Sequence, residues 1–361
     1  MIIGIDASKA AIKQRTGVEN FVYQVLLNLG QIDKKNTYYL YTNAKLPDEL
    51  LASPNFHEKL IPFPKLWNKF RLPLALLKDK PDRYFQPVYM IPAFAPKKSV
   101  GVFHDLAWKY FPEAYSSAEL FLQTQALDNL KERAQKILCV SDSTKKDLIA
   151  VRPEVENRIE VITLAGDDTF VQENSYQDSL KIGPKYFMSL GRLEDRKNTL
   201  RIIEAFILAK KRENLPHKLL LIGKPGHGYQ KIEELIKENP EFAKEIIIPG
   251  YLDKSKINNL LSNCEAFVFP SLYEGFGIPI VEAMKAGAPI ITADSSSLPE
   301  VAGSAGIIVN PLDSLEIADA MIKVAKDGQL RQDMIKKSLQ QAEKYNWKDT
   351  AGKILKILEE L

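Results

Sequence analysis

Cysteine and histidine are scarce in this sequence of 361 residues, and neither is clustered. The two cysteines, Cys139 and Cys264, lie in separate apolar runs, so they form no CxxC motif and no disulfide framework. Buried thiols of this kind are usually inert, and low cysteine content suits a reducing compartment. The histidines are scattered too, so neither residue type offers the spacing of a metal site, and we expect none.

Two other features are missing: a strong excess of one charge and a long hydrophobic run. The chain has 49 basic and 46 acidic side chains, a formal net charge of +3, which does not indicate a nucleic-acid partner. No run of about 20 apolar residues is present, so we expect no transmembrane helix. The N-terminus, MIIGIDAS, predicts a strand rather than a signal peptide. We therefore expect a cytoplasmic protein, with peripheral contact at the inner face of the plasma membrane left open.

What is present is an ordinary globular composition in a chain long enough for two domains. The first half opens with a strand, a polar loop and an amphipathic helix. Later strands are predicted at residues 100–103 and 137–140, and they end at His104 and Ser141. Ligands of parallel sheets bind beyond such strand ends, although Ser141 could equally cap the helix that begins near Thr144.

The second half repeats this alternation after a polar segment, VQENSYQDSLKIGP at residues 171–184, which we predict to be a linker. Five strand-and-helix units follow in series, and the C-terminal tail predicts an amphipathic helix. We therefore expect an α/β protein of two doubly wound, Rossmann-like domains that face each other across a cleft. The predicted domains are residues 1–170 and 185–344, with a C-terminal helix at 345–361 that packs back toward the first domain.

The strongest chemical signal lies at residues 270–284, PSLYEGFGIPIVEAM. Glu274 and Glu282 are separated by seven residues, among which two glycines permit a tight loop and Pro279 suits a helix start. Carboxylates in such a place suit hydroxyl-rich partners, because they accept hydrogen bonds from sugar and ribose hydroxyls. Alternatively, Glu282 is a first-turn acid that the helix dipole favours, and Glu274 is a surface residue.

A second signal is the turn GRLEDRKN at residues 191–198, directly after a predicted strand. Arg192 and Lys197 flank an acidic stretch, and a planar guanidinium and a compact ammonium both suit a diphosphate. Fixed cations that face a leaving nucleotide diphosphate stabilise its developing charge, as a divalent metal does elsewhere. For this turn alone, a solvated charged turn with a Glu194–Lys197 pair is the simpler alternative.

Together these segments resemble the retaining glycosyltransferases of family 4, whose architecture of two Rossmann-like domains is called GT-B. The E-x7-E pattern and the basic pair both match that family. FHDL at residues 103–106 resembles mannosyltransferase-like members, and GKPG, PGYL and SLPEVAG follow in the family's order. The resemblance covers nearly the whole chain and is weakest over residues 45–95.

The resemblance implies a role for each matching residue. Arg192 and Lys197 would hold the donor diphosphate, and Glu282 would hold the ribose hydroxyls. His104 would face the donor sugar near the reacting carbon, although a histidine at a strand end is also often a structural hydrogen-bonding group. The implied donor-binding set is Gly17, Arg192, Lys197, Glu274, Gly275, Phe276, Gly277 and Glu282, and the implied catalytic set is His104, Arg192, Lys197 and Glu274.

The sequence departs from the family pattern at two places. The loop after the first strand has one glycine, Gly17, where many members have more, and LAGDD stands where many have an Asn-Gly pair. Both departures leave the charged roles intact and bear on how the acceptor lies. Gly17 would let its loop approach the phosphates or the acceptor.

The resemblance implies a metal-independent reaction that retains anomeric configuration and needs no cofactor besides a GDP- or UDP-linked donor, with GDP-mannose favoured. Because no carboxylate nucleophile stands out, we expect a front-side route in which the leaving phosphate deprotonates the acceptor, a glycan or a lipid-linked sugar. The segment KLWNKFRLPLALLK at residues 65–78 predicts either a membrane-contacting helix or a core helix with a basic rim.

Three other functions use the same features. A sugar-nucleotide epimerase shares the architecture but needs no acceptor, and a nucleotide-sugar-binding protein would need no catalysis. A dinucleotide oxidoreductase is disfavoured, because no GxGxxG follows the first strand. Consumption of donor only when acceptor is present would separate transfer from epimerisation.

Overall fold

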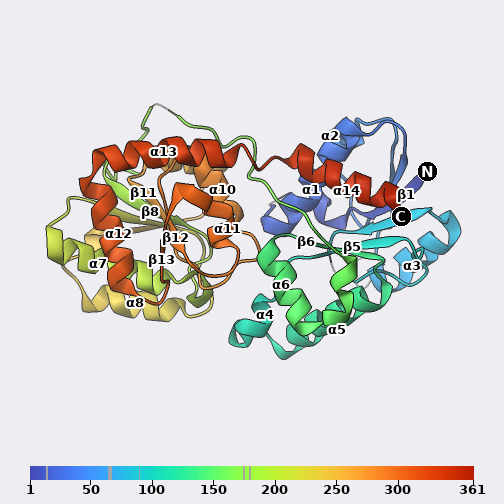
Figure 1. Cartoon of the computed structure of the whole chain (residues 1–361), viewed down its shortest axis with the longest axis horizontal. Coiled ribbons are helices and arrows are strands. Elements are labelled where there is room, and N and C mark those ends of the chain that lie inside the picture. The colour runs from blue at the N-terminus through green and yellow to red at the C-terminus, as the bar shows by residue number, and fades with distance from the viewer. Residues whose placement is uncertain (14, 64–66, 89, 174, 179) are drawn as a thin grey trace. The chain divides into compact units, whose positions relative to one another are not determined.

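The computed structural model describes residues 1–361 except 14, 64–66, 89, 174 and 179, and the chain divides into two compact units. Unit 1 comprises Met1–Leu164 and Asn346–Leu361, and unit 2 comprises Ala165–Tyr345. Each unit is a parallel sheet with helices packed on it (Figure 1), which confirms the predicted class of two doubly wound α/β domains.

Over the described residues, the sheet of unit 1 has seven parallel strands in the order β3-β2-β1-β4-β5-β6-β7. The strands are β1 (Ile2–Asp6), β2 (Thr37–Thr42), β3 (Phe56–Leu60), β4 (Arg83–Gln86), β5 (Ser99–Phe103), β6 (Lys136–Cys139) and β7 (Ile159–Val161). The helices are η1 (Ser8–Ala11), α1 (Gly17–Ile32), α2 (Asp48–Leu51), α3 (Trp67–Asp79), α4 (Ala107–Tyr110), η2 (Pro112–Ala114), α5 (Ser117–Arg133), α6 (Asp142–Val151), η3 (Pro153–Arg158) and α14 (Trp347–Glu360).

The sheet of unit 2 has six parallel strands within the described residues, in the order β10-β9-β8-β11-β12-β13. The strands are β8 (Tyr186–Leu190), β9 (Lys218–Ile222), β10 (Ile246–Gly250), β11 (Ala266–Phe269), β12 (Ile290–Ala293) and β13 (Gly306–Val309). The helices are η4 (Asp195–Lys197), α7 (Thr199–Glu213), α8 (Tyr229–Glu238), η5 (Ala243–Glu245), α9 (Lys254–Asn263), α10 (Ile278–Lys285), α11 (Leu298–Ala302), η6 (Gly303–Ala305), α12 (Ser314–Lys326) and α13 (Gly328–Ala342).

The central strands of unit 2 are apolar runs that are buried along their whole length, as parallel sheets require when helices cover both faces. The sixth strand, β13, was not among the five units that we predicted. The sequence analysis missed it because GIIV is short and follows directly on the short helix η6.

The C-terminal helix α14 packs on α1 within unit 1, and Figure 1 shows the two side by side. Its apolar stripe is buried, with Trp347 against Phe21 at a ring-centroid distance of 6.2 Å. Asn346 caps its first turn, and Thr350 Oγ1 donates to the carbonyl oxygen of Thr163 at 2.6 Å. Unit 1 is therefore completed by the two ends of the chain.

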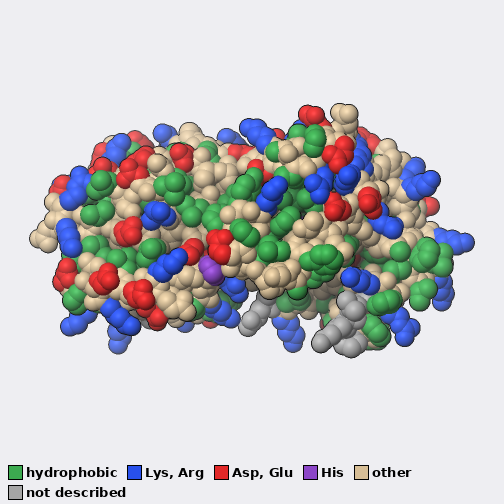
Figure 2. Space-filling view, turned by 90° about the horizontal axis from the view of Figure 1, so that it is seen from below, with side chains coloured by type: hydrophobic (Ala, Val, Ile, Leu, Met, Phe, Trp, Pro, Cys, Tyr) green, Lys and Arg blue, Asp and Glu red, His purple; other side chains and the backbone are tan. Residues whose placement is uncertain are grey.

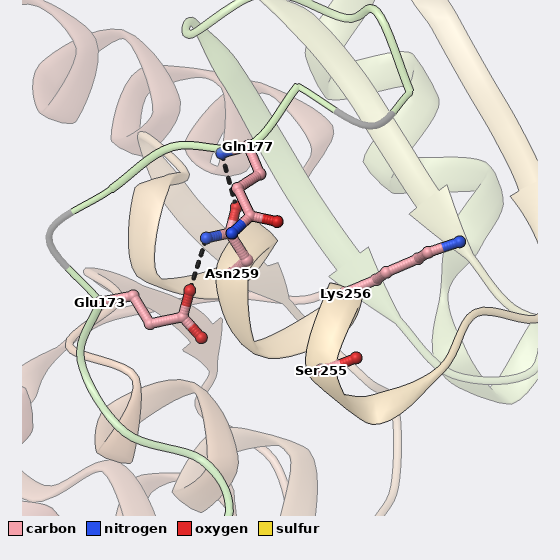
Figure 3. Close-up of a pocket in the computed structure, with 5 residues that line it drawn as sticks. All are labelled: Glu173, Gln177, Ser255, Lys256 and Asn259. Atoms are coloured by element: carbon pink, nitrogen blue, oxygen red, sulfur yellow. Dashed lines mark hydrogen bonds between the residues drawn. The ribbon is translucent and has the colours of Figure 1, made fainter.

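The domain boundary differs from our prediction. Unit 1 ends at Leu164 rather than at residue 170, and the predicted linker 171–184 belongs to unit 2. The reason is hydrogen bonding to α9: Glu173 accepts from Asn259 Nδ2 at 2.5 Å, and the backbone N–H of Gln177 donates to Asn259 Oδ1 at 2.9 Å (Figure 3). A polar sequence predicts exposure but does not reveal that a helix elsewhere will bind it.

Candidate functional site

The loops that follow the strands of unit 2 meet at the carboxyl edge of its sheet. The turn after β8 is joined to the loop after β9, because the backbone N–H of Leu193 donates to the carbonyl of Lys224 at 3.0 Å. It is joined to the loop after β11 by the N–H of Leu272, which donates to the carbonyl of Arg196 at 2.9 Å. These bonds bring the two predicted motifs, 191–198 and 270–284, to one place.

Two glycines are required by this packing. A Cβ on Gly223 would lie 1.7 Å from the carbonyl oxygen of Gly191, so only glycine allows the loops after β8 and β9 to approach this closely. Gly277, the N-cap of α10, has a φ of 105°, a conformation that L side chains rarely adopt. These two glycines are therefore required by the close approach and the conformation of the backbone.

Lys197 and Glu274 form the centre of the site. Lys197 Nζ donates to Glu274 Oε1 at 2.5 Å, and the side chains are 15% and 10% exposed. Arg196 adds a second cation, with Nη1 3.3 Å from Glu274 Oε2 and Nη2 3.1 Å from Glu194 Oε1. Burial alone would raise the pKa of Glu274, but the charges of Lys197 and Arg196 outweigh burial and hold this pKa below its ordinary value.

The loop that carries Glu274 is fixed by the serines that follow β12. The backbone N–H of Glu274 donates to Ser296 Oγ at 2.9 Å, and Ser297 Oγ lies 2.7 Å from the carbonyl oxygen of Phe276. In the part of the chain that the structure describes, the backbone N–H groups of Phe276 and Gly277 donate no hydrogen bond. Ser297 thus binds this loop through a carbonyl oxygen and leaves the two N–H groups without a partner among the described residues.

Arg192 is placed differently from Lys197, although the two were predicted as a pair. It is exposed, and it makes no hydrogen bond or ion pair with any described residue. Lys197 instead lies along Gly191, because a Cβ there would be 3.7 Å from Lys197 Cε. The cation that contacts Glu274 beside Lys197 is Arg196, which the sequence analysis did not single out and which no sequence signal distinguishes from its neighbours.

Glu282 lies on α10, in surroundings unlike those of Glu274. Burial raises the pKa of Glu282 to about 7, Lys254 and Lys285 act in the opposite direction, and Asp167 adds to the rise. No described cation forms an ion pair with it. The structure therefore joins Lys197 to Glu274 directly, whereas Glu282 lies against Gly166 and near Asp167, which the sequence analysis did not assign to the site.

The predicted residues of unit 1 lie at the amino end of α1 and beyond β5. His104 Nε2 is 2.8 Å from the carbonyl oxygen of Pro87, and its ring packs edge-on against Phe21. Because a carbonyl only accepts, Nε2 carries the proton in the neutral ring, and burial lowers the pKa of His104. Gly17 begins α1, and a Cβ there would meet no atom within 4 Å, so the fold itself does not require glycine.

Two other predicted features have simple structural roles. Ser141 caps α6 by accepting from the backbone N–H of Thr144 at 3.0 Å, which is the alternative that we had kept open. Cys139 and Cys264 are buried and free, and burial raises the pKa of Cys139 to about 12. Among the described residues, no helix is both long enough and apolar enough to cross a bilayer.

Comparison with known proteins bears on the identity of this site. Residues 171–341 match the family model described as glycosyl transferases group 1. O-antigen chain mannosyltransferase B of Escherichia coli is 27% identical over 307 residues, which cover 83% of this chain and 80% of that protein. The serotype-specific mannosyltransferase WbdA of Escherichia coli is 30% identical over 267 residues, which cover 71% of this chain but 32% of that longer protein.

Solved structures show the same fold. Sucrose-phosphate synthase from Thermosynechococcus elongatus has a TM-score of 0.75 at 17% identity, with 99% of this chain and 98% of that chain covered. WaaG, a glycosyltransferase involved in lipopolysaccharide biosynthesis, has a TM-score of 0.73 at 14% identity, with 99% of both chains covered. This chain has the GT-B fold and is a glycosyltransferase, and its residues 171–341 match group 1 of these enzymes.

Proposed function

We propose that this enzyme transfers mannose, with retention of configuration, from a nucleotide diphosphate mannose to a glycan or lipid-linked acceptor in polysaccharide biosynthesis. The observation that carries the proposal is the buried group of Lys197, Arg196 and Glu274 at the carboxyl edge of the unit 2 sheet. The choice of mannose rests on the relatives, whose names describe mannosyltransferases of O-antigen chains. GDP is the favoured nucleotide, and UDP is the alternative.

The charge of the site suits a diphosphate. Arg192, Arg196 and Lys197 supply three positive charges, whereas Glu194 and Glu274 supply two negative charges. The surplus positive charge and the exposed Arg192 are available to a diphosphate, and they would stabilise the charge that develops as it leaves. We therefore propose catalysis without a metal.

Glu274 then serves the donor sugar. Lys197 and Arg196 keep its carboxylate ionised and oriented, and its remaining lone pairs would accept hydrogen bonds from sugar hydroxyls. In the front-side route, the bond from the anomeric carbon to the phosphate oxygen breaks as the acceptor oxygen bonds to that carbon on the same face. The acceptor proton passes to the departing phosphate oxygen. We propose that His104 binds the donor sugar, because its unprotonated Nδ1 would accept a hydrogen bond from a sugar hydroxyl.

A thermal-shift panel of GDP- and UDP-sugars tests this function. A nucleotide at about a hundred times its Kd should add about 2.7 kcal/mol to the free energy of unfolding. Arg192→Ala and Lys197→Ala should abolish the shift, whereas Lys231→Met, which removes an exposed lysine paired with Asp195 beside the same turn, should keep it. Unchanged shifts in both site variants would refute the assignment, and donor consumption without any acceptor would favour an epimerase.

We also propose peripheral contact of unit 1 with the inner face of an anionic membrane, through α3. Its buried face contains Trp67, Leu72 and Leu76, but Phe70 and Leu74 on the other side are 60% and 57% exposed. Leu77 continues this exposed face and lines a shallow hollow with Phe94. Basic side chains on α3 and in the chain that follows it are also exposed: Lys69, Arg71, Lys78, Lys80, Lys97 and Lys98.

This combination of exposed apolar side chains and basic charge suits an anionic lipid surface. Figure 2, which views the molecule from below, shows hydrophobic and basic side chains next to one another near the right-hand edge of the picture. Lys65, which belongs to the predicted segment, lies outside the described residues. Phe70→Ser with Leu74→Ser should abolish co-sedimentation with phosphatidylglycerol vesicles but leave nucleotide binding intact. Equal sedimentation with neutral phosphatidylcholine vesicles would contradict the charge argument.

A further inference from the structure

Glu282 is covered by a short segment that comes just before the predicted linker. A Cβ on Gly166 would lie 3.0 Å from Glu282 Cγ and 3.1 Å from its backbone nitrogen, so the segment crosses the glutamate in direct contact. Asp167, the next residue, lies near enough for its backbone and its charge to influence the ionisation of the Glu282 carboxylate. The segment is thus positioned to fix the direction in which this carboxylate points.

Two lysines connect this segment to helices α9 and α10. Lys285 on α10 donates to the carbonyl of Gly166 at 3.2 Å and pairs with Asp168 at 2.5 Å. Lys254 on α9 pairs with Asp167, whose carboxylate also accepts from the N–H of Thr169 at 3.0 Å and from its Oγ1 at 2.8 Å. We call residues 166–168 with Lys254 and Lys285 the clip.

The clip also sets the charge around Glu282. Burial opposes ionisation of Asp167, but Lys254 and Thr169 outweigh burial and lower its pKa, so Asp167 is an anion beside Glu282. The charged groups that face Glu282 are Asp167 from the segment, Lys254 from α9 and Lys285 from α10. Asp167 and Lys254 therefore act on Glu282 with opposite sign, and each also neutralises the other.

We propose that Asp167 and Lys254 form a positioning pair, which holds the segment that lies against Glu282 and sets the pH range over which Glu282 binds the nucleotide ribose. The inference rests on the proposed function and on the role that the family resemblance implies for Glu282, which is to accept hydrogen bonds from the ribose hydroxyls. It gives a role to the LAGDD segment, which departs from the family pattern. An ionised Glu282 is the stronger acceptor, so nucleotide affinity should rise with pH.

The test is nucleotide affinity as a function of pH, measured with GDP or UDP, whichever binds the unmodified protein more tightly. Asp167→Asn removes an anion and leaves Lys254 uncompensated, so the midpoint of the pH dependence should fall. Lys254→Met leaves Asp167 uncompensated, so the midpoint should rise. We expect shifts of about 0.5 to 1 pH unit in opposite directions.

Two controls separate this role from a structural one. Lys256→Met removes an exposed lysine from the same helix and should move the midpoint in neither direction. The 2′,3′-dideoxy nucleotide lacks the hydroxyls that Glu282 would bind, so its affinity should lose the pH dependence in the unmodified protein.

The outcomes distinguish this inference from the proposed function. If the unmodified protein binds nucleotide with a pH dependence whose midpoint is the same in both variants, the proposed role of the clip is refuted and the proposed function stands. Absence of nucleotide binding in the unmodified protein would remove both. If Asp167→Asn does not fold, Lys254→Met decides alone, because the side chain of Lys254 is 48% exposed and its replacement leaves no cavity.

Discussion

Glu274 and Glu282 are eight positions apart. Glu274 is buried and Glu282 is half-buried, yet their pKa values shift in opposite directions. At Glu274, Lys197 and Arg196 touch the carboxylate, so its pKa falls. At Glu282, burial raises the pKa to about 7, because no described cation forms an ion pair with the carboxylate and the charge of Asp167 opposes those of Lys254 and Lys285. Burial alone does not fix the charge of an acid; the partners in contact decide it.

The largest effect expected from this comparison follows the loss of Lys197. Lys197→Met would leave a buried carboxylate with Arg196 as its remaining close cation, and we expect a loss of about 3 kcal/mol in the free energy of unfolding. Urea unfolding at pH 7.5 measures it. The exposed Lys231→Met, which breaks the surface pair with Asp195, should cost about 0.5 kcal/mol. Equal losses in the two variants would show that burial of the Glu274 pair is unimportant.

A second prediction uses amides in place of the two acids. The pKa of Glu282 in the folded state is raised, so its contribution to stability is present below about pH 4.5 and is lost as pH rises toward 7. Glu282→Gln should therefore stabilise the fold at pH 8, by about 2 kcal/mol relative to its effect at pH 5.

Glu274→Gln should do the reverse. Its lowered pKa means that Glu274 contributes stability above its unfolded pKa and loses it as pH falls, so the amide should destabilise the fold most at neutral and high pH. Urea unfolding of both variants at pH 5 and pH 8 makes the comparison. The same sign in both variants at pH 8 would contradict the assigned ionisation.

The smallest effect on stability is expected at Arg192. Its side chain is exposed and makes no ion pair with a described residue, so Arg192→Ala should change the free energy of unfolding by less than about 0.5 kcal/mol. Thermal unfolding without ligand measures this. A loss comparable to that of Lys197→Met would mean that Arg192 also stabilises the buried Glu274. The difference that we draw between Lys197, which contacts Glu274, and the exposed Arg192 would then be wrong.

Much of the fold could be predicted from the pattern of apolar runs. The central strands of unit 2 are continuous apolar segments, and the loops after β8 and β11 are marked by glycines and charges. The domain boundary could not be predicted, because the polar segment 171–184 gave no sign that Asn258 and Asn259 on α9 would bind it. Short strands such as β13 were also missed.

The sequence by itself determined the two parallel sheets and the placing of Lys197 and Glu274 in turns after strands, with Glu282 one turn into the helix that follows, because apolar periodicity and glycine positions act locally. Only the tertiary structure decided which cations meet which acid. Arg196 and Arg192 belong to one turn, but packing of that turn against the loop after β11 brings Arg196 alone of the two to Glu274. Likewise, Gly166 and Asp167 reach Glu282 only because the chain folds back over α10, and such long-range contacts depend on packing that no local pattern encodes.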